Sequence, residues 1–222
     1  MRTFIIGDVH GCYDELISLT EKIGLTPEDH LYFVGDLINK GPKSLEVVEY
    51  VRNRPNTWST IGNHEYFLLT HLDDFNPKMI TPEIERWRLS SSFRDIVEYQ
   101  NLLAPHKDWI LSLPHIIERE DFIIVHGGLH PDHGLSTPLE IATLIRIHEG
   151  RPWYEYYTGQ KPIFYGHWAA EGLRLRENTI GLDTGCCFGG ALTAYCLETR
   201  EISQVRANAI YKEPAHWKKK VI

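Results

Sequence analysis

The segment 31–42, Leu-Tyr-Phe-Val-Gly-Asp-Leu-Ile-Asn-Lys-Gly-Pro, indicates the fold more clearly than any other stretch of the chain. It opens with an apolar run of strand length and continues as a glycine-containing turn that carries one carboxylate, one amide and one ammonium. In open α/β sheets, ligands bind at the edge where the strands end. A polar turn directly after a buried strand is therefore a candidate for part of a binding site.

Short apolar runs of the same kind recur along the chain, and most of them are bounded by glycine. Between the first three runs, apolar residues at helical spacing predict helices over 13–23 and 43–53. This order of strands and helices predicts an α/β fold that begins βαβαβ. The predicted strands are 4–6, 31–34, 58–61, 122–125, 163–165, 179–182, 191–197 and 202–205.

The pattern turns helical from about residue 64 to about residue 112, which predicts a helical cap inserted into the sheet. Further along, a helix is expected over 138–145 behind the capping signal Ser136-Thr137, and another over 152–157. No linker or internal repeat interrupts the sequence. We therefore predict one domain spanning residues 1–222, with the cap insertion at about 64–112.

Composition narrows the classes of function. The formal net charge of −7 over 222 residues disfavours binding to long nucleic acid. The 4 cysteines lack CxxC spacing, so we expect buried free thiols in a reducing compartment. No apolar run approaches the roughly 18 residues that span a bilayer, so we expect a cytoplasmic protein that makes no membrane contact.

Five predicted strand ends place a side chain capable of binding metal within a residue or two of a glycine. These ends are 7–10, 35–36, 62–64, 126–128 and 166–167. Glycine allows a sharp turn with positive φ, which would let the neighbouring side chain point inward from the sheet edge. The candidate ligands collected in this way are Asp8, His10, Asp36, Asn63, His126 and His167.

This mixture of carboxylates, imidazoles and an amide suits a pair of divalent ions better than one structural zinc. We expect manganese, with iron, cobalt, zinc and magnesium as alternatives. Each residue alone also has a purely structural explanation as a turn former or a satisfied histidine, but five such strand ends in order favour a site. Asp36 is central in the set and could bridge both ions. The histidines outside this pattern are interpreted as ordinary surface or core residues: His30, His71, His106, His115, His130, His133, His148 and His216.

Taken together as "GDVHG", "GDLINKGP", "GNHE", "VHGG" and "GH", these motifs resemble those of the calcineurin-like metallophosphoesterases. The resemblance points to the branch that contains phosphoprotein phosphatases and diadenosine tetraphosphatases, and the segment 181–198 extends it. It implies two mixed sheets packed as a sandwich flanked by helices. It also implies that Asp8 and His10 bind a first metal, that Asp36 bridges, that Asn63, His126 and His167 bind a second metal, and that His64 assists the leaving group.

The opening turn departs from the phosphoprotein phosphatases, in which the matching segment carries an Asp that supports the catalytic histidine and an Arg that grips phosphate. Here the corresponding residues are Asn39 and Lys40. An Asn could accept a hydrogen bond from His64 but would not raise its pKa by charge, and a Lys offers a point charge instead of a bidentate fork. Arg146 is either the missing fork or a solvated cation at a helix end.

A weakly supported acid suits a good leaving group. We therefore expect hydrolysis of the phosphoric anhydrides of dinucleoside polyphosphates, by attack of a hydroxide that bridges the two metals. The alternatives are a serine/threonine protein phosphatase, whose motif spelling "GNHE" resembles, and an RNA-cap pyrophosphohydrolase. The substrate would be a small dinucleotide or a phosphoprotein, and we expect a monomer or weak oligomer. Trp168 and the aromatic run 153–157 are candidates either for base stacking or for core packing.

Overall fold

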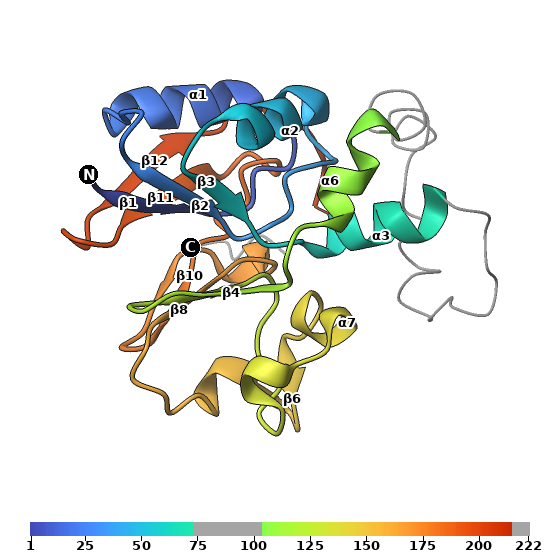
Figure 1. The fold of residues 1–222 in the computed structure, drawn as a ribbon, viewed down its shortest axis with the longest axis vertical. Helices are drawn as coiled ribbons and strands as arrows, with labels where there is room; N and C mark the ends of the chain where they lie inside the picture. The colour runs from blue at the N-terminus through green and yellow to red at the C-terminus, as the bar shows by residue number, and fades with distance from the viewer. Residues whose placement is uncertain (73–103, 215–222) are drawn as a thin grey trace.

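The computed structural model describes residues 1–72 and 104–214, which form two sheets packed face to face with helices on the outside (Figure 1). The first sheet is five-stranded in the order β12-β11-β1-β2-β3, and the second is five-stranded in the order β4-β5-β8-β10-β9. The first comprises β1 (Thr3–Ile6), β2 (His30–Phe33), β3 (Thr57–Ser59), β11 (Ala191–Cys196) and β12 (Ile202–Arg206). The second comprises β4 (Ile116–Glu118), β5 (Ile123–Val125), β8 (Ile163–Tyr165), β9 (Arg174–Leu175) and β10 (Thr179–Gly181).

Alternation along β1 divides its side chains between two apolar layers. Phe4 and Ile6 pack into a core beneath helices α1 (Tyr13–Lys22) and α2 (Ser44–Asn53), whereas Ile5 packs into a second core between the sheets. Because successive side chains of a strand point to opposite faces, a strand buried on both faces is apolar at every position. This explains the unbroken apolar runs and confirms the predicted α/β sandwich.

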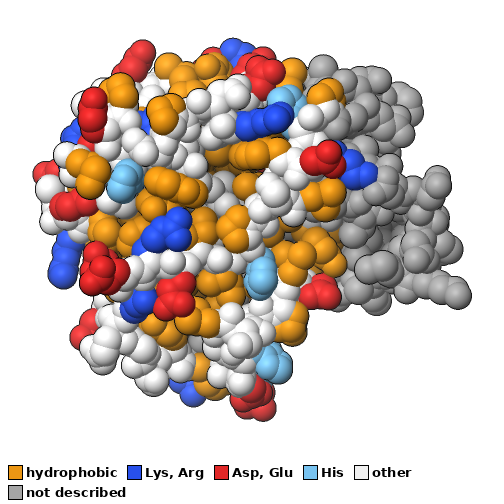
Figure 2. All heavy atoms as spheres, viewed as in Figure 1, with side chains coloured by type: hydrophobic (Ala, Val, Ile, Leu, Met, Phe, Trp, Pro, Cys, Tyr) orange, Lys and Arg blue, Asp and Glu red, His pale blue; other side chains and the backbone are white. Residues whose placement is uncertain are grey.

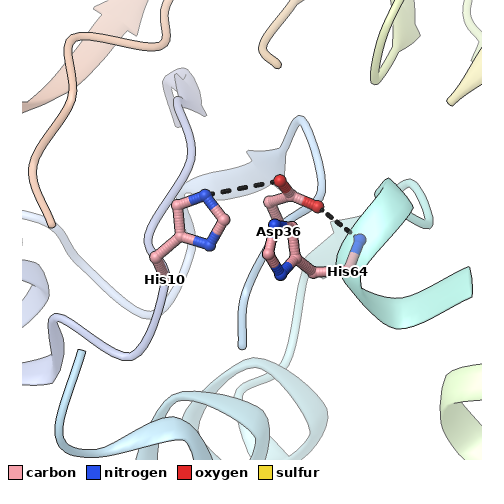
Figure 3. A group of neighbouring side chains, drawn as sticks. All are labelled: His10, Asp36 and His64. Carbon is pink, nitrogen blue, oxygen red and sulfur yellow. Dashed lines mark hydrogen bonds and ion pairs between the residues drawn. The ribbon is translucent and has the colours of Figure 1, made fainter. Parts of the chain in front are cut away.

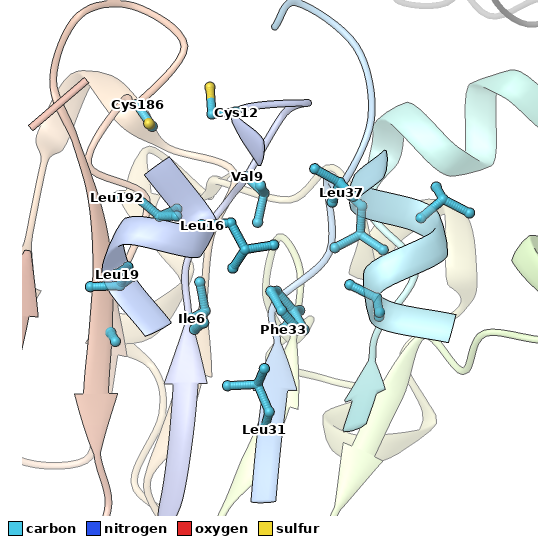
Figure 4. Close-up of a cluster of buried hydrophobic side chains, with 14 of the residues drawn as sticks. Ile6, Val9, Cys12, Leu16, Leu19, Leu31, Phe33, Leu37, Cys186 and Leu192 are labelled. Atoms are coloured by element: carbon cyan, nitrogen blue, oxygen red, sulfur yellow. The ribbon is translucent and has the colours of Figure 1, made fainter. Parts of the chain in front are cut away.

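The larger core fills the space between the first sheet and its two helices (Figure 4). Leu16 and Leu19 of α1 lie over Ile6, and Phe33 and Leu37 continue the same layer toward α2 (Figure 4). All five side chains are fully buried. This packing fixes β1 and β2 side by side, so that the turns that follow them leave the sheet at one edge.

Parallel pairing sets the register at this edge. Ile6 of β1 pairs with Phe33 of β2, and Phe33 pairs with Ser59 of β3. In the second sheet, β5 and β8 are also parallel, with Ile123 opposite Ile163. The polar turns that follow these strands are consequently brought together.

Two predicted helices differ from the structure. Only Leu139–Ala142 (α7) of the expected 138–145 is α-helical, and Thr137 does not cap it because its hydroxyl donates to the Gly134 carbonyl at 2.6 Å. The expected helix 152–157 is a 3-10 turn, Trp153–Glu155 (η5), fixed by the burial of Trp153. The short strands β4, β6 (Ile147–His148), β7 (Arg151–Pro152) and β9 were not predicted, because two or three residues carry too little periodicity.

Within the predicted cap region, about 64–112, the structure describes helix α3 (Asn63–Leu72), the 3-10 turn η3 (Ala104–His106) and helix α6 (Lys107–Leu111). The part of the cap prediction over 73–103 lies outside the described residues. The remaining 3-10 turns are η4 (Gly134–Ser136) and η6 (Ala169–Glu171). The single-domain assignment stays a prediction.

The expectations on cysteines and surface charge can be compared with the structure. All four cysteines are buried and free, as predicted. On the face shown in Figure 2, basic and acidic side chains are interspersed among apolar ones, so this face presents no continuous basic surface. Among residues 1–72 and 104–214, no helix is both long and apolar enough to cross a bilayer.

Candidate metal centre

Asp36 lies at the centre of the predicted site (Figure 3). Its Oδ2 is 3.3 Å from Nε2 of His10 on one side and 3.4 Å from Nε2 of His126 on the other. Its other oxygen, Oδ1, accepts a hydrogen bond of 3.0 Å from the backbone N–H of His64 at the start of α3. One carboxylate oxygen thus faces two imidazoles from different sheets, which is the geometry that a bridging ligand requires.

The remaining predicted ligands converge on the same place. The Asn63 Oδ1 lies 2.9 Å from Nε2 of His126 and 2.7 Å from Nδ1 of His167. Asp8 accepts from the backbone N–H of His167, and its Oδ2 lies 4.0 Å from Nε2 of His10. The structure therefore brings together all six residues selected from the sequence.

Two groups of metal-competent atoms share Asp36. In one, Asp36 lies with His10 and His64, and in the other it lies with His126 and His167. Within each group all the ligand atoms lie within 4.8 Å of one another. Two adjacent clusters with one common carboxylate fit a pair of divalent ions better than a single ion.

The pKa values of the candidate ligands are shifted in ways that are expected of a cation-binding site. Burial opposes ionisation of Asp36, but His126, His64 and His10 hold the pKa of its carboxyl well below the usual range. Burial also opposes protonation of His126, yet the Asp36 carboxylate raises the pKa of that imidazole to about 9. Burial and Asp183 raise the pKa of Asp8 well above its ordinary value. Metal ions bound here would replace these protons, so the donor set fits them.

Several residues of the site have backbone torsions that are unfavourable for residues other than glycine. His10, Asp36, Asn39, Lys40 and His167 all have positive φ, between 49° and 72°. Non-glycine residues reach this region at a cost of order 1–3 kcal/mol each, and they cluster at functional sites. The expectation that glycine supplies the positive φ holds at Gly35, with φ 98°, but most of the unusual torsions belong to the polar residues themselves.

Close approach explains another of the strand-end glycines. A Cβ added at Gly166 would overlap Oδ1 of Asp8, so the bare backbone of this residue leaves room for the carboxylate of the other sheet. Glycine there acts through its lack of a side chain and not through its torsions.

Glu65 has a positioning role that the sequence did not reveal. Its fully buried carboxylate accepts four backbone N–H groups, from Gly62 at 2.8 Å, Asp36 at 2.9 Å, Leu37 at 2.8 Å and Ile38 at 3.2 Å. It joins the turn after β2 to the start of α3 and holds the strained segment that carries Asp36. Glu65 does not line the cavity over the site.

Asp183 is a second residue that sequence reasoning missed. It follows β10 within the stretch Gly181-Leu182-Asp183, is 6% exposed, and lines the same cavity as Asp8. Burial is the largest cause that raises its pKa above the usual value. A strand, a glycine and then a carboxylate form the same signal that identified the other five strand ends, so it could have been found.

Asn39 makes a hydrogen bond to His64, as expected, but the direction of this hydrogen bond is the reverse of the one predicted. The Asn39 side-chain Nδ2 lies 2.8 Å from Nδ1 of His64, so the amide donates and the imidazole accepts. In this orientation of the amide, Nδ1 of His64 carries no proton, and the Asn39 Oδ1 is buried without a hydrogen-bond partner. Burial, followed by the Lys40 charge, lowers the pKa of His64 well below its ordinary value.

Lys40 and Arg146 bring positive charge to a cavity of about 310 Å³ that opens over the site. The Nζ of Lys40 lies 2.7 Å from Nε2 of His10 and 5.0 Å from the ring centre of Phe188. Arg146 donates to the backbone carbonyl of His167 at 2.6 Å. Both residues line the cavity, and Arg146 is exposed to solvent there, four residues beyond the end of α7 at Ala142.

The aromatic candidates separate into two groups. Trp168 lines the cavity beside His167, and the guanidinium of Arg174 lies 4.9 Å from its ring centre. Trp153 and Tyr154 are buried in the apolar core on the outer side of the second sheet. Trp168 is therefore placed where a substrate could stack on it, whereas Trp153 and Tyr154 pack in the core.

Comparison with known proteins agrees with this geometry. Residues 1–188 match the calcineurin-like phosphoesterase family. A bis(5'-nucleosyl)-tetraphosphatase PrpE [asymmetrical] from Geobacillus sp. is 32% identical, with 88% of this chain and 90% of the relative covered. A symmetrical bis(5'-nucleosyl)-tetraphosphatase from Methylobacillus flagellatus is 28% identical, with 92% and 95% covered.

Solved structures show the same architecture. A crystal structure of a candidate diadenosine tetraphosphatase superposes with a TM-score of 0.74 at 28% identity, covering 94% of this chain and 95% of that one. A metallophosphoesterase from Sphaerobacter thermophilus shares the fold, with a TM-score of 0.59 at 21% identity over 93% of this chain and 88% of that one. The chain belongs to the calcineurin-like phosphoesterase family, and it is a metal-dependent hydrolase.

Proposed function

We propose that this protein hydrolyses phosphoric anhydride bonds of dinucleoside polyphosphates such as diadenosine tetraphosphate, with two manganese ions in the centre around Asp36. The hydrogen bond from Asn39 to His64 carries the proposal. Relatives named bis(5'-nucleosyl)-tetraphosphatase, both symmetrical and asymmetrical, support the substrate class.

Asp8 and His10 would hold one ion, Asn63, His126 and His167 the other, and Asp36 both. When bound, two such ions acidify water and neutralise charge on the transferred phosphoryl group. The residues of the chain then orient the substrate and handle the proton of the leaving oxygen. Asp183, beside the first set, is a further anionic donor at the cavity wall.

His64 is suited to a leaving group that needs little protonation. Asn39 directs an N–H at its Nδ1, and nearby Lys40 adds positive charge, so both oppose an imidazolium. A serine alkoxide must be protonated as it leaves, whereas a phosphate or nucleotide leaves readily as an anion. The neutral ring can still donate a hydrogen bond from Nε2. This arrangement favours anhydride cleavage over ester cleavage.

Cations and an aromatic surface complete the cavity. Lys40 and Arg146 would balance the charge of a polyphosphate chain, Arg146 with the planar fork that Lys40 lacks. Trp168 and Phe188 line the same cavity and offer faces on which a nucleobase can stack. A cavity of about 310 Å³ accommodates part of a dinucleotide and leaves the remainder at its mouth.

The test compares purified protein supplied with Mn²⁺ on diadenosine tetraphosphate, a phosphoserine peptide and a capped RNA, with the nucleotide products separated by chromatography. We expect the highest kcat/KM on the dinucleotide, and the product pair will show whether cleavage is symmetrical. Faster turnover of the phosphopeptide would favour a protein phosphatase. Faster release of the cap would favour an RNA-cap pyrophosphohydrolase.

A further inference from the structure

Three histidines gather outside the metal centre, although nothing in the sequence pattern connected them. His130 and His133 lie in the loop after β5, and His148 lies in β6, which is at the lower end of the molecule in Figure 1. The ring centre of His130 is 4.7 Å from that of His133 and 4.6 Å from that of His148. They are surface histidines, as expected, but the fold brings them together.

A carboxylate completes the cluster. Ligand atoms of His130, Asp132 and His148 all lie within 4.8 Å of one another, with Nδ1 of His130 3.8 Å from Oδ2 of Asp132. A tetrahedral zinc ion with nitrogen ligands at about 2.0–2.1 Å places its donor atoms roughly 3.3 Å apart. Nδ1 of His130 accepts a hydrogen bond of 3.3 Å from the backbone N–H of Asp132, so binding zinc requires that the side chains rotate and that this hydrogen bond is given up or Nε2 is used instead.

The backbone that carries the donors is already ordered by hydrogen bonds. The buried Thr137 hydroxyl accepts from the N–H of His130 at 2.9 Å, and the N–H of His133 donates to the His130 carbonyl at 3.1 Å. On the other segment, the Tyr156 hydroxyl donates to the His148 carbonyl at 3.1 Å. Binding an ion would therefore cost little backbone entropy, because both segments keep their conformation.

We propose that His130, Asp132 and His148 form a zinc-binding site separate from the metal centre around Asp36, and that His133, whose ring neighbours that of His130, turns to supply the fourth donor. Imidazole nitrogen and carboxylate oxygen are both zinc ligands, and a site with four protein ligands is structural and not catalytic. Zinc exceeds manganese in affinity for such nitrogen donors. Because the side chain of Asp132 is 77% exposed, the site lies at the surface and exchanges its ion with solvent.

Such an ion would connect two segments that each follow a residue of the candidate site. One is the loop that begins at His126, and the other is the β6–β7 hairpin, in which His148 pairs with Arg151. Arg146 lies two residues before His148, and its side chain lines the cavity. Zinc would thus stabilise the hairpin that follows Arg146, without contact to the substrate.

The experiment counts zinc in three versions of the whole chain after removal of metal by chelation. These are the wild type, the double variant His130→Gln/His148→Gln, and His115→Gln as a matched control outside the cluster. Each is titrated with Zn²⁺ against a chromophoric chelator. Because the residues around Asp36 are intact in all three, their zinc contributes equally. We expect the wild type and the control to bind one zinc more per chain than the double variant.

Hydrogen exchange supplies a readout independent of activity. Zinc should slow exchange at residues 130–137 and 147–152 in the wild type and the control, but not in the double variant. If the double variant unfolds, His148→Gln alone must lose the same single zinc. Equal stoichiometry and affinity in all chains, or protection that survives the substitutions, would overturn the proposal.

Discussion

Replacement of Glu65 by glutamine tests how the metal centre is supported. The carboxylate of Glu65 receives two N–H donors at each oxygen: Leu37 and Ile38 at Oε1, and Asp36 and Gly62 at Oε2. A glutamine keeps one acceptor oxygen and directs its NH₂ group at the other pair. Two buried N–H donors then lack an acceptor in either orientation of the amide.

The expected cost follows from these contacts. An unsatisfied buried donor costs about 1–3 kcal/mol, so two of them predict a loss of about 2–6 kcal/mol in the free energy of unfolding. The lower end is expected, because a neutral amide is cheaper to bury than a carboxylate. Release of the strained Asp36 turn should also lower kcat, although Glu65 does not line the cavity.

Urea unfolding followed by circular dichroism measures this difference. The matched control is Glu46→Gln, which makes the same chemical change at an exposed position in the first turn of α2. We expect the control to change stability by less than about 0.5 kcal/mol. A Glu65→Gln protein within about 0.5 kcal/mol of wild type would show that the four hydrogen bonds do not hold the turn.

Three further predictions concern the metals. Asp36→Asn should lower kcat by several orders of magnitude and weaken the binding of both ions. The fold should survive, because an amide oxygen can still accept the hydrogen bond from the backbone N–H of His64. A variant with two tightly bound ions and a normal rate would exclude the bridging role. Mn²⁺ should restore activity to chelated protein better than Ca²⁺, which prefers a cage of oxygen ligands, and full activity without metal or with Ca²⁺ alone would contradict a binuclear centre. The affinity for Mn²⁺, measured by calorimetry, should rise as the pH increases toward 9. Asp36 raises the pKa of His126 to about 9, and the proton on His126 must leave before a metal binds. An affinity independent of pH would contradict this prediction.

The sequence was sufficient to predict those parts of the fold that rest on long apolar patterns. Strands such as β1 and β2 are buried on both faces, so every residue of Phe4–Ile6 is apolar and the strand is visible without a structure. The short strands β6 and β7 pair through two residues each, which leaves no periodic signal. The helix expected behind Thr137 failed because that hydroxyl is used inside the preceding loop instead.

The candidate site also has parts that the sequence predicted and parts that it did not. Six ligand positions could be predicted because each lies at the end of a strand, close to a glycine, and parallel strands bring such positions to one edge. Glu65 could not be assigned its role, because a charged residue in the first turn of a helix is ordinarily exposed and only the folded chain shows four N–H groups around it. The grouping of His130 with His148 depends on a chain reversal that local sequence does not specify.

The central claim is that the turn after β2 fits His64 to a good leaving group. It is tested most directly by the ratio of kcat/KM for diadenosine tetraphosphate to that for a phosphoserine peptide, measured across pH in the wild type and in Asn39→Asp/Lys40→Arg. A carboxylate beside Nδ1 would raise the pKa of His64, so the imidazolium would persist to higher pH and could protonate a departing alkoxide. We predict that the wild type prefers the dinucleotide and that the double variant gains selectively on the peptide. An equal response of both substrates, or a wild type that already prefers the peptide, would contradict the account.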